Sequence, residues 1–361
     1  MNKRFTRFTL ALLLVVQGVS LFAQAVTTPR ALSPAAMVGQ TVGISTVTVT
    51  YSRPSVKGRD IWGAQVPYGY TVIPFGTANP APWRAGANEN TVITFSHPAK
   101  VEGRGVPAGS YGLFFAVNKD NSAELVLSKD YKAWGNFFYE PSHDLMRVKI
   151  QTAEVPMTEM LTYEFVNNTR TTTELHLRWE KKLFPVKMEF AVDDIVIANA
   201  EAELQGAIGF NFQSYLTAVN YAMQNNVALD KSLVWVDKAV AINKSFATLN
   251  AKAGVLRKMG KNEEADKLKE EAVAIGNEND LNVYGYQLLN QNQFDKGIEV
   301  LTLVTQRYPK SANAWDSLGE AYYLKGDKKN AKVYFTKSLT LNPPEATKAN
   351  SEKYLKMIAE K

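Results

Sequence analysis

The N-terminal half of the chain alternates apolar and polar residues with a period of two. Val47, Val49 and Tyr51 share one face of such a stretch, and threonines fill the positions between them. This period is typical of a half-buried strand. The same alternation recurs at 91–96, 110–117, 124–128, 145–151, 161–166, 174–179 and 186–190. We therefore predict an antiparallel β-sandwich or jelly-roll-like domain over residues 32–198.

The apolar period becomes helical at about Glu201, after a connection near 198–205. Ala, Lys, Leu, Glu and Asn dominate from there, and the pattern divides into units of helical-hairpin length. The units are 213–245, 246–277, 278–311 and 312–345, and a last amphipathic helix follows at about 345–360. This pattern predicts an α-solenoid over residues 206–361 with a capping helix at its end. The whole chain is then an α+β protein of two domains.

The last unit carries a spaced set of large and small residues. Its members are Trp315, Leu318, Gly319, Tyr322, Ala331, Phe335 and Pro343. The offsets resemble those of a tetratricopeptide repeat, a helix–turn–helix unit of about 34 residues. The unit at 278–311 keeps Gly285 and Pro309, and the two earlier units match only in residue size. The resemblance implies a scaffold that binds a protein or peptide, with the aromatic residues as core packing.

In a stacked array of this kind, the first helix of each hairpin lines the concave surface. The helix positions that point away from the packing face are Asn279, Asn282, Tyr286, Leu289, Asn313, Asp316, Glu320 and Tyr323, preceded upstream by Asn250, Arg257 and Lys258 and, in the first unit, by Thr217, Tyr221, Gln224 and Asn225. Amide side chains both donate and accept, so they can bond the backbone of an extended peptide. We expect these residues to form a partner-binding groove. The alternative is a solvated polar face with no specific ligand.

Three motifs stand out in the strand-rich block, at 51–59, 83–89 and 107–114. In this order, with Trp134 and Trp179 behind them, they resemble a family of exported bacterial proteins known only as domain of unknown function 2911. The resemblance covers about residues 32–192 and implies no established activity. The chain departs from the family pattern at 70–82, where the link between the first two motifs is longer.

The first two motifs also supply a candidate ligand site. Its members are Tyr51, Arg53, Lys57, Arg59, Tyr68, Trp83, Arg84, Asn88 and Glu89. Guanidinium groups suit a carboxylate or phosphate, and the aromatic rings would equally suit a sugar. The structural alternative is that Arg84 and Glu89 form an ion pair that fixes the loop.

Candidate chemistry beyond binding is sparse. His97, His143 and His176 lack metal-ligand spacing, and no nucleophile elbow, P-loop or dinucleotide fingerprint occurs. We therefore expect no metal, no cofactor and a noncatalytic binding or scaffold protein. Two alternatives remain: a carbohydrate-binding module with a helical appendage, and a hydrolase whose site lies in the 51–89 loops, with a carboxylate such as Asp60 or Glu89.

Residues 1–25 have the features of a secretory signal. A basic start with Lys3, Arg4 and Arg7 precedes an apolar run, and Ala23-Gln24-Ala25 forms a small-residue cleavage pattern. Removing this acid-free segment lowers the formal charge from +6 to +3, which gives no reason to expect nucleic-acid binding. The chain has no cysteine. We expect an exported bacterial protein, periplasmic or secreted, with no membrane span after cleavage.

Overall fold

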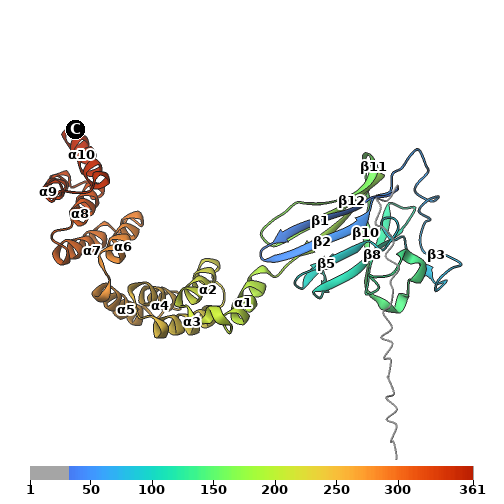
Figure 1. Cartoon of the computed structure of the whole chain (residues 1–361), viewed down its shortest axis with the longest axis horizontal. Helices are drawn as coiled ribbons and strands as arrows, with labels where there is room; N and C mark the ends of the chain where they lie inside the picture. Colours follow the sequence, from blue (N-terminus) through green and yellow to red (C-terminus); the bar gives the residue numbers. More distant parts are fainter. Residues whose placement is uncertain (1–31, 361) are drawn as a thin grey trace, which may run out of the picture. The chain divides into compact units, whose positions relative to one another are not determined.

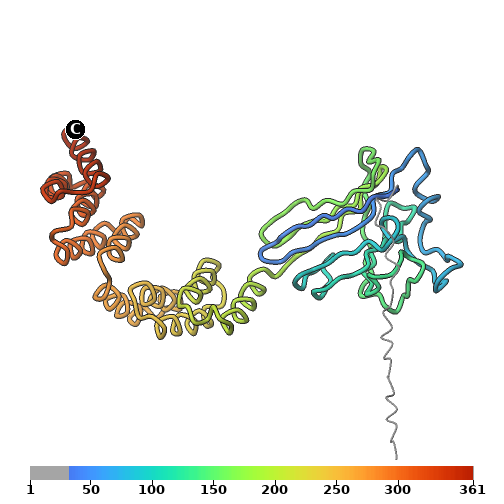
Figure 2. The backbone as a smooth tube through the Cα atoms, in the orientation of Figure 1, coloured from blue at the N-terminus to red at the C-terminus, as the bar shows by residue number. Residues whose placement is uncertain are grey.

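The structure, a computed structural model, describes residues 32–360; the expected signal segment at 1–25 lies outside the described residues. The chain forms two compact units, and each is described by itself. The first holds the strands up to Glu189. The second holds the helices from Phe190 onward together with two short pieces, 41–45 and 169–171. Figure 1 labels the elements and Figure 2 traces the backbone.

Two open sheets, mostly antiparallel, build the strand-rich unit. The six-stranded sheet has the order β1 (Ala35–Val42), β2 (Ser45–Ser52), β5 (Val92–Phe95), β8 (Gly109–Val117), β9 (Ser122–Ser128), β10 (Asp144–Gln151). The four-stranded sheet has the order β11 (Ala153–Val166), β12 (Thr172–Glu189), β6 (Ala99–Val101), β7 (Arg104–Val106), and β3 (Thr71–Val72) pairs with β4 (Pro80–Ala81). The sandwich predicted from the alternation is confirmed.

Three details differ from the sequence prediction. The stretches 174–179 and 186–189 belong to one strand, β12, whose buried positions change from odd residues up to Trp179 to even residues from Phe184, next to the positive φ of Glu180. β1 was not predicted; its side chains alternate between exposed and half-buried up to Thr41, and only Val42 at its end is buried. β6 and β7 were not predicted either; they form a short hairpin whose tip holds Glu102 and Gly103, both with positive φ.

Aromatic pairs fill the space between the two sheets. Tyr51 of β2 packs edge-on against Tyr163 of β11, with ring centroids 4.7 Å apart. Phe115 of β8 and Phe184 of β12 are both fully buried, and their centroids are 5.0 Å apart. Such rings remove a large apolar area from water, so they set the spacing of the sheets.

Ten α-helices follow in the described part of the chain. They are α1 (Val192–Glu203), α2 (Phe212–Asn225), α3 (Leu229–Ile242), α4 (Phe246–Lys258), α5 (Asn262–Ile275), α6 (Glu278–Asn290), α7 (Phe294–Arg307), α8 (Ala312–Lys325), α9 (Lys328–Leu339) and α10 (Glu345–Ala359). The pairs from α2 to α9 match the four predicted units, and α10 is the expected final helix. α1 begins inside the range given to the β domain, because Asp193 and Asp194 favour a helix N-terminus there.

Polar side chains cap the N-termini of five of these helices: α2, α4, α6, α8 and α9. Ser245 and Thr248 form a capping box at α4, and Asn277 and Asp280 form another at α6. The Ser311 hydroxyl accepts from the Ala314 amide at the start of α8. These contacts satisfy backbone donors that have no partner within the helix.

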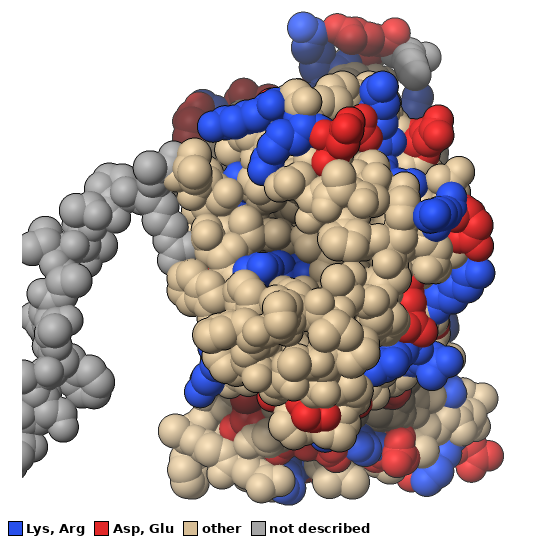
Figure 3. Space-filling model, turned by 90° about the vertical axis from the view of Figure 1, so that its right-hand side faces the viewer, with Lys and Arg blue, Asp and Glu red and all other residues tan. Residues whose placement is uncertain are grey.

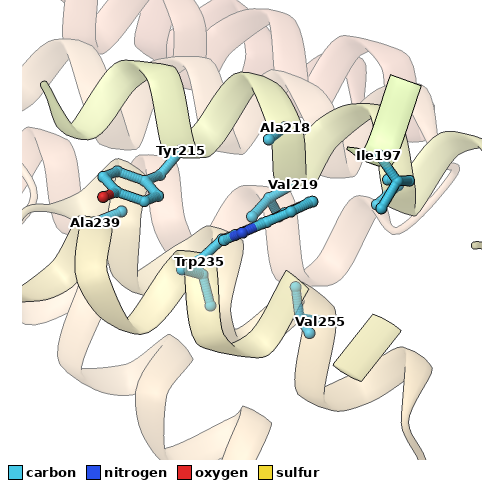
Figure 4. Packing of buried hydrophobic residues seen from close by; sticks show 9 residues of the cluster. Ile197, Tyr215, Ala218, Val219, Trp235, Ala239 and Val255 are labelled. Atoms are coloured by element: carbon cyan, nitrogen blue, oxygen red, sulfur yellow. The ribbon is translucent and has the colours of Figure 1, made fainter. Parts of the chain in front are cut away.

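Apolar side chains interlock neighbouring helices. At the start of the array, Trp235 of α3 lies among Ile197, Val219 and Val255, which come from three other helices (Figure 4). In the last repeat, Phe335 is fully buried against Gly319. A Cβ atom added at Gly319 would lie 2.9 Å from the Phe335 ring, so the glycine allows α8 and α9 to approach closely.

Candidate functional site

A hollow of about 340 Å³ lies on the side of the array formed by the first helix of each hairpin. We call it the groove. Its lining comes from three successive first helices: Leu216 and Asn220 of α2, Phe246, Ala247, Asn250 and Ala251 of α4, and Asn279, Asp280, Val283, Tyr284 and Gln287 of α6. The lining thus combines four amide side chains with apolar and aromatic ones.

Among the predicted partner-binding residues, Asn279 lines the groove, as does Asn250 upstream. Asn220, Val283 and Gln287 were not predicted. In the first unit the repeat pattern is degenerate, so the helix face was assigned to Thr217 and Tyr221 rather than Asn220. For α6, the regular offsets missed the side of the helix that faces α4.

Two of the predicted residues in the last repeat hold helices together. Asp316 is 4% exposed and accepts hydrogen bonds from Ser351 and, at 2.9 Å, from Asn350, both in α10. Glu320 accepts from Tyr286 of α6 and from Tyr354 of α10, each at 3.0 Å. These carboxylates therefore face neighbouring helices in this structure.

The same contacts define a ladder through the array. Tyr286, Glu320 and Tyr354 stand 34 residues apart, on α6, α8 and α10. The sequence signal was present, because α10 continues the repeat spacing, but α10 was assigned only as a solvated cap. Tyr323 packs edge-on against Tyr354, with centroids 4.8 Å apart. Asn313 is exposed, and Asn282 is half-buried. Partner binding by these residues stays a prediction.

In the strand-rich unit, the first motif is tied into the sandwich. The Tyr51 ring is 5% exposed, and its hydroxyl accepts from the Tyr163 amide at 3.2 Å. Arg53 donates through Nε to the Leu161 carbonyl at 3.0 Å and through Nη2 to the Thr162 hydroxyl at 2.7 Å. Both side chains therefore fasten β11 to the loop after β2.

Lys57 and Arg59 are brought together. Both are exposed, and with Leu32, Ser33, Pro34 and Ser55 they line a hollow of about 310 Å³. Arg59 is oriented by hydrogen bonds to the Val56 carbonyl at 3.1 Å and the Gln65 side chain at 2.9 Å. The Lys57 amide donates to Glu159 at 2.9 Å, which fixes the loop and leaves the Lys57 side chain at the surface.

The second motif lies apart from that hollow. Trp83 stacks on Trp179 with centroids 5.7 Å apart, inside an aromatic cluster that includes Trp62. Arg84 donates to the Asn88 carbonyl at 2.7 Å and lies over the Phe137 ring. Burial lowers the pKa of Arg84.

Of the other predicted ligand residues, Asn88 has positive φ, Glu89 is half-buried, and Tyr68 is 37% exposed. Arg84 thus fixes its loop through a backbone carbonyl.

Figure 3 shows one face of the molecule, with Lys, Arg, Asp and Glu mostly along its edges and a hollow whose floor carries basic atoms.

The three histidines lie on separate segments. His143 contacts Asp130 at 2.8 Å, His176 contacts Glu174 at 3.2 Å, and His97 contacts Ser96 at 3.0 Å. Over residues 32–360, no group of three or more His, Cys, Asp or Glu side chains is arranged to hold a metal ion. The same range contains no helix with the length and apolarity needed to cross a membrane.

Comparison with known proteins agrees with this division of the chain. Residues 33–188 match the family model described as protein of unknown function (DUF2911). This DUF2911 match covers the sandwich, and a tetratricopeptide repeat model matches residues 312–345, the α8–α9 hairpin. No curated protein matches the chain.

Solved structures resemble part of the chain. A structure of pilF from Pseudomonas aeruginosa is 24% identical, covers 41% of this chain and 69% of its own, and has a TM-score of 0.28. A MamA structure is 20% identical, with 40% and 80% covered and a TM-score of 0.27. MamA from Desulfovibrio magneticus RS-1 is 17% identical, with 41% and 89% covered and a TM-score of 0.26. The repeat match itself supports a protein-binding scaffold.

The buried carboxyl of Asp316 gives a pH-dependent prediction. Burial, with a smaller contribution from the Glu320 charge, raises the pKa of Asp316, although its hydrogen bonds from Ser351 and Asn350 oppose the shift. A raised pKa in the folded state means that folding favours the protonated acid. The stability that the protonated Asp316 carboxyl contributes is fully present below the unfolded-state pKa of about 4. It is lost as the pH rises through the folded-state pKa. Wild type should therefore lose thermal stability relative to Asp316→Asn between pH 3.5 and pH 6.

The measurement is the melting temperature of the helical signal by circular dichroism at each pH. Asn350 can rotate its amide to bond an asparagine at 316, so the hydrogen-bonded contact with α10 is kept. Asp230→Asn on α3, an exposed position, controls for the loss of one carboxylate. Parallel pH profiles for wild type and Asp316→Asn would contradict the prediction.

Proposed function

We propose that this protein is an exported, noncatalytic scaffold whose helical array binds an extended polypeptide segment in the groove of α2, α4 and α6. The observation that carries the proposal is the groove lining, in which Asn220, Asn250, Asn279 and Gln287 surround apolar side chains. Amides can pair with both the N–H and the C=O groups of a peptide backbone. Leu216, Phe246 and Val283 supply the apolar surface that a partner side chain needs.

The distribution of the lining over three hairpins favours an elongated ligand. A segment that crosses α2, α4 and α6 can reach side chains from each of them, and repeat arrays commonly use their concave surface in this way. The interior of each hairpin is closed by packing, as at Phe335 and Gly319. Binding energy is therefore expected at the groove and not within the hairpins.

A bulky charged side chain in the groove should block binding. Val283 is 47% exposed and lines the groove, whereas Val333 is 58% exposed and lies on α9, outside the groove lining. Peptides selected for binding from a library of capped octapeptides should bind Val283→Arg at least about tenfold more weakly than wild type, since truncating or blocking a contact at the centre of an interface costs 1–2 kcal/mol or more.

Fluorescence anisotropy of the selected peptides measures this change. Val333→Arg adds the same charge and volume at a similarly exposed site, so it should bind like wild type. Equal affinity for both variants would mean that the partner binds elsewhere on the array.

For the strand-rich unit, we propose a second binding surface for a small polar anion at the Lys57 and Arg59 hollow. The proposal rests on two exposed basic side chains that line the same hollow with the Ser33 and Ser55 residues. Arg59 is oriented by its hydrogen bonds, and Lys57 extends from a fixed backbone. Such a pair suits a carboxylate or phosphate group.

Inorganic phosphate and acetate are suitable probes for this surface. We expect either anion to shift the backbone amide signals of residues 55–59 in NMR spectra, with saturation in the millimolar range, on the order of 10 mM. Lys57→Gln should abolish saturation. Lys100→Gln, which removes a lysine that pairs with Glu189 on β12, is the matched control. If Lys57→Gln shows the same saturation as wild type, the proposal that Lys57 binds the anion is contradicted.

Export is proposed from the basic and apolar pattern of residues 1–25. N-terminal sequencing of the protein recovered from its native cells should give a chain that starts at Val26 or Ala25, in the envelope or the medium. A protein that retains Met1 and fractionates with the cytoplasm would contradict export.

A further inference from the structure

Lys269 stands at a core position of the repeat. In three of the four hairpins, a small residue near the start of the second helix is followed four positions later by a buried apolar residue. Those apolar residues are Val236, Leu301 and Phe335, and each is 0% exposed. In the second hairpin Ala265 is the small residue, so the equivalent position is Lys269. A lysine here breaks the pattern that stabilises the array.

The Lys269 side chain crosses the hairpin toward the groove. Its ammonium donates to the Asn250 side-chain oxygen on α4 and lies 4.1 Å from the centroid of the Tyr284 ring on α6. Both Asn250 and Tyr284 line the groove. Lys269 therefore places a cation behind the wall of the groove, at the point where α4 and α6 face each other.

This cation has no carboxylate partner among residues 32–360. The charge that acts on it most is that of Arg257 on α4, which is also positive; burial first and Arg257 second lower the pKa of Lys269 to about 8. Arg257 is itself paired with Asp266 on α5. The other charged groups nearby are Asp280 of α6 in the groove lining, and Glu270, Lys296 and Glu299, which line a second hollow with Lys269.

Tyr284 lies between two hollows. α6 begins 32 residues after α4, whereas α8 begins 34 residues after α6. Only Gly276 and Asn277 connect α5 to α6, while four residues connect α7 to α8. Tyr284 occupies the position that Leu318 has in the last repeat. The groove of about 340 Å³ lies on one side of it and a hollow of about 550 Å³ on the other.

We propose that Lys269 receives the side-chain carboxylate of an aspartate or glutamate in the polypeptide segment that binds the groove. This inference rests on the proposed function and adds the chemistry of the partner. A buried ammonium that lacks a counter-charge is costly, and a carboxylate beside it recovers part of that cost. Asn250 and Tyr284 hold the ammonium in place, so little side-chain freedom is lost on binding.

An internal acidic side chain fits the groove better than a chain terminus does. The groove lining continues from α2 across α4 to α6, so a segment can extend to both sides of Asn250, the groove residue that accepts from Lys269. Lys269 itself lines the second hollow, on the other side of Tyr284. The alternative is a structural role only, in which the methylene groups of Lys269 pack within the hairpin and its ammonium is hydrated. The two accounts differ in whether a ligand carboxylate responds to Lys269.

The test uses the whole protein and a library of random octapeptides, acetylated at the N-terminus and amidated at the C-terminus. Wild type should select peptides with Asp or Glu at one fixed position. Replacing that residue by Asn or Gln should weaken binding by at least about tenfold, as expected for a desolvated charge pair. Lys269→Met should lose the acidic preference while folding normally, because an apolar residue restores the repeat pattern. Lys337→Met on α9, an exposed lysine, should behave as wild type.

The pH dependence of peptide affinity tests whether binding depends on the charge of Lys269 or only on the shape of its side chain. Because the free ammonium titrates near pH 8, the affinity of the acidic peptide for wild type should fall as pH rises from 8 to 9.5, by up to about tenfold per pH unit. Lys269→Arg stays charged in this range. Its affinity for the acidic peptide, weaker or not, should therefore be independent of pH.

Each negative result of the peptide selection contradicts a different claim. Selected peptides without an acidic residue, bound equally by Lys269→Met, would overturn this inference and leave the proposed function intact. Binding only of peptides with a free C-terminal carboxylate would overturn the side-chain assignment. Selection of no peptide at all would contradict the proposed function, and this inference with it.

Discussion

The helical array depends on burying the apolar face of each hairpin against the next hairpin along the chain. One hairpin alone cannot remove that face from water, so stability grows by stacking neighbours. The residues at the equivalent positions Val236, Leu301 and Phe335 are fully buried and contribute to this burial in three of the hairpins. Polar contacts then fix the register: Tyr286 of α6 and Tyr354 of the final helix α10 both donate to Glu320 of α8. Because a net hydrogen bond contributes only about 1 kcal/mol, the ladder sets the alignment more than it supplies the stability.

The groove lies away from the hydrogen-bonded end of the array. Between α6 and α8, the Tyr286 hydroxyl donates to Glu320, so these side chains bond each other. The groove lining comes instead from α2, α4 and α6, and only Gly276 and Asn277 connect α5 to α6. Arg307 of α7 caps the end of α5 by donating to the Val273 and Gly276 carbonyls, so the joint is held even though hollows open beside it. Hydrogen bonds therefore join the last helices of the array, whereas hollows lie beside its middle helices.

The sequence predicted the architecture well because its signals are local and periodic. Alternation at Val47, Val49 and Tyr51 and the offsets of the 312–345 unit follow directly from strand and helix geometry. The merged strand β12 and the hairpin β6–β7 were missed because charged or glycine-rich positions interrupt the alternation. Candidate sites were harder to predict, since they depend on which helix lies against which. Asp316 and Glu320 lie on a polar helix face, and only the docking of α10 shows that this face is covered.

Departures from the repeat pattern are more informative about function than agreement with it. Trp315, Gly319 and Phe335 agree with the pattern, and their packing accounts for them completely. Lys269 and Tyr284 disagree with it, and both lie at the same junction, in contact with each other. A sequence usually breaks its own folding rules where another requirement competes with stability. Here, the lysine replaces a buried apolar residue, and its charge reaches the groove wall through Asn250. Tyr284 packs against Phe246, so packing accounts for its ring, whereas packing does not account for a charge at Lys269. A requirement that acts on the groove accounts for the lysine.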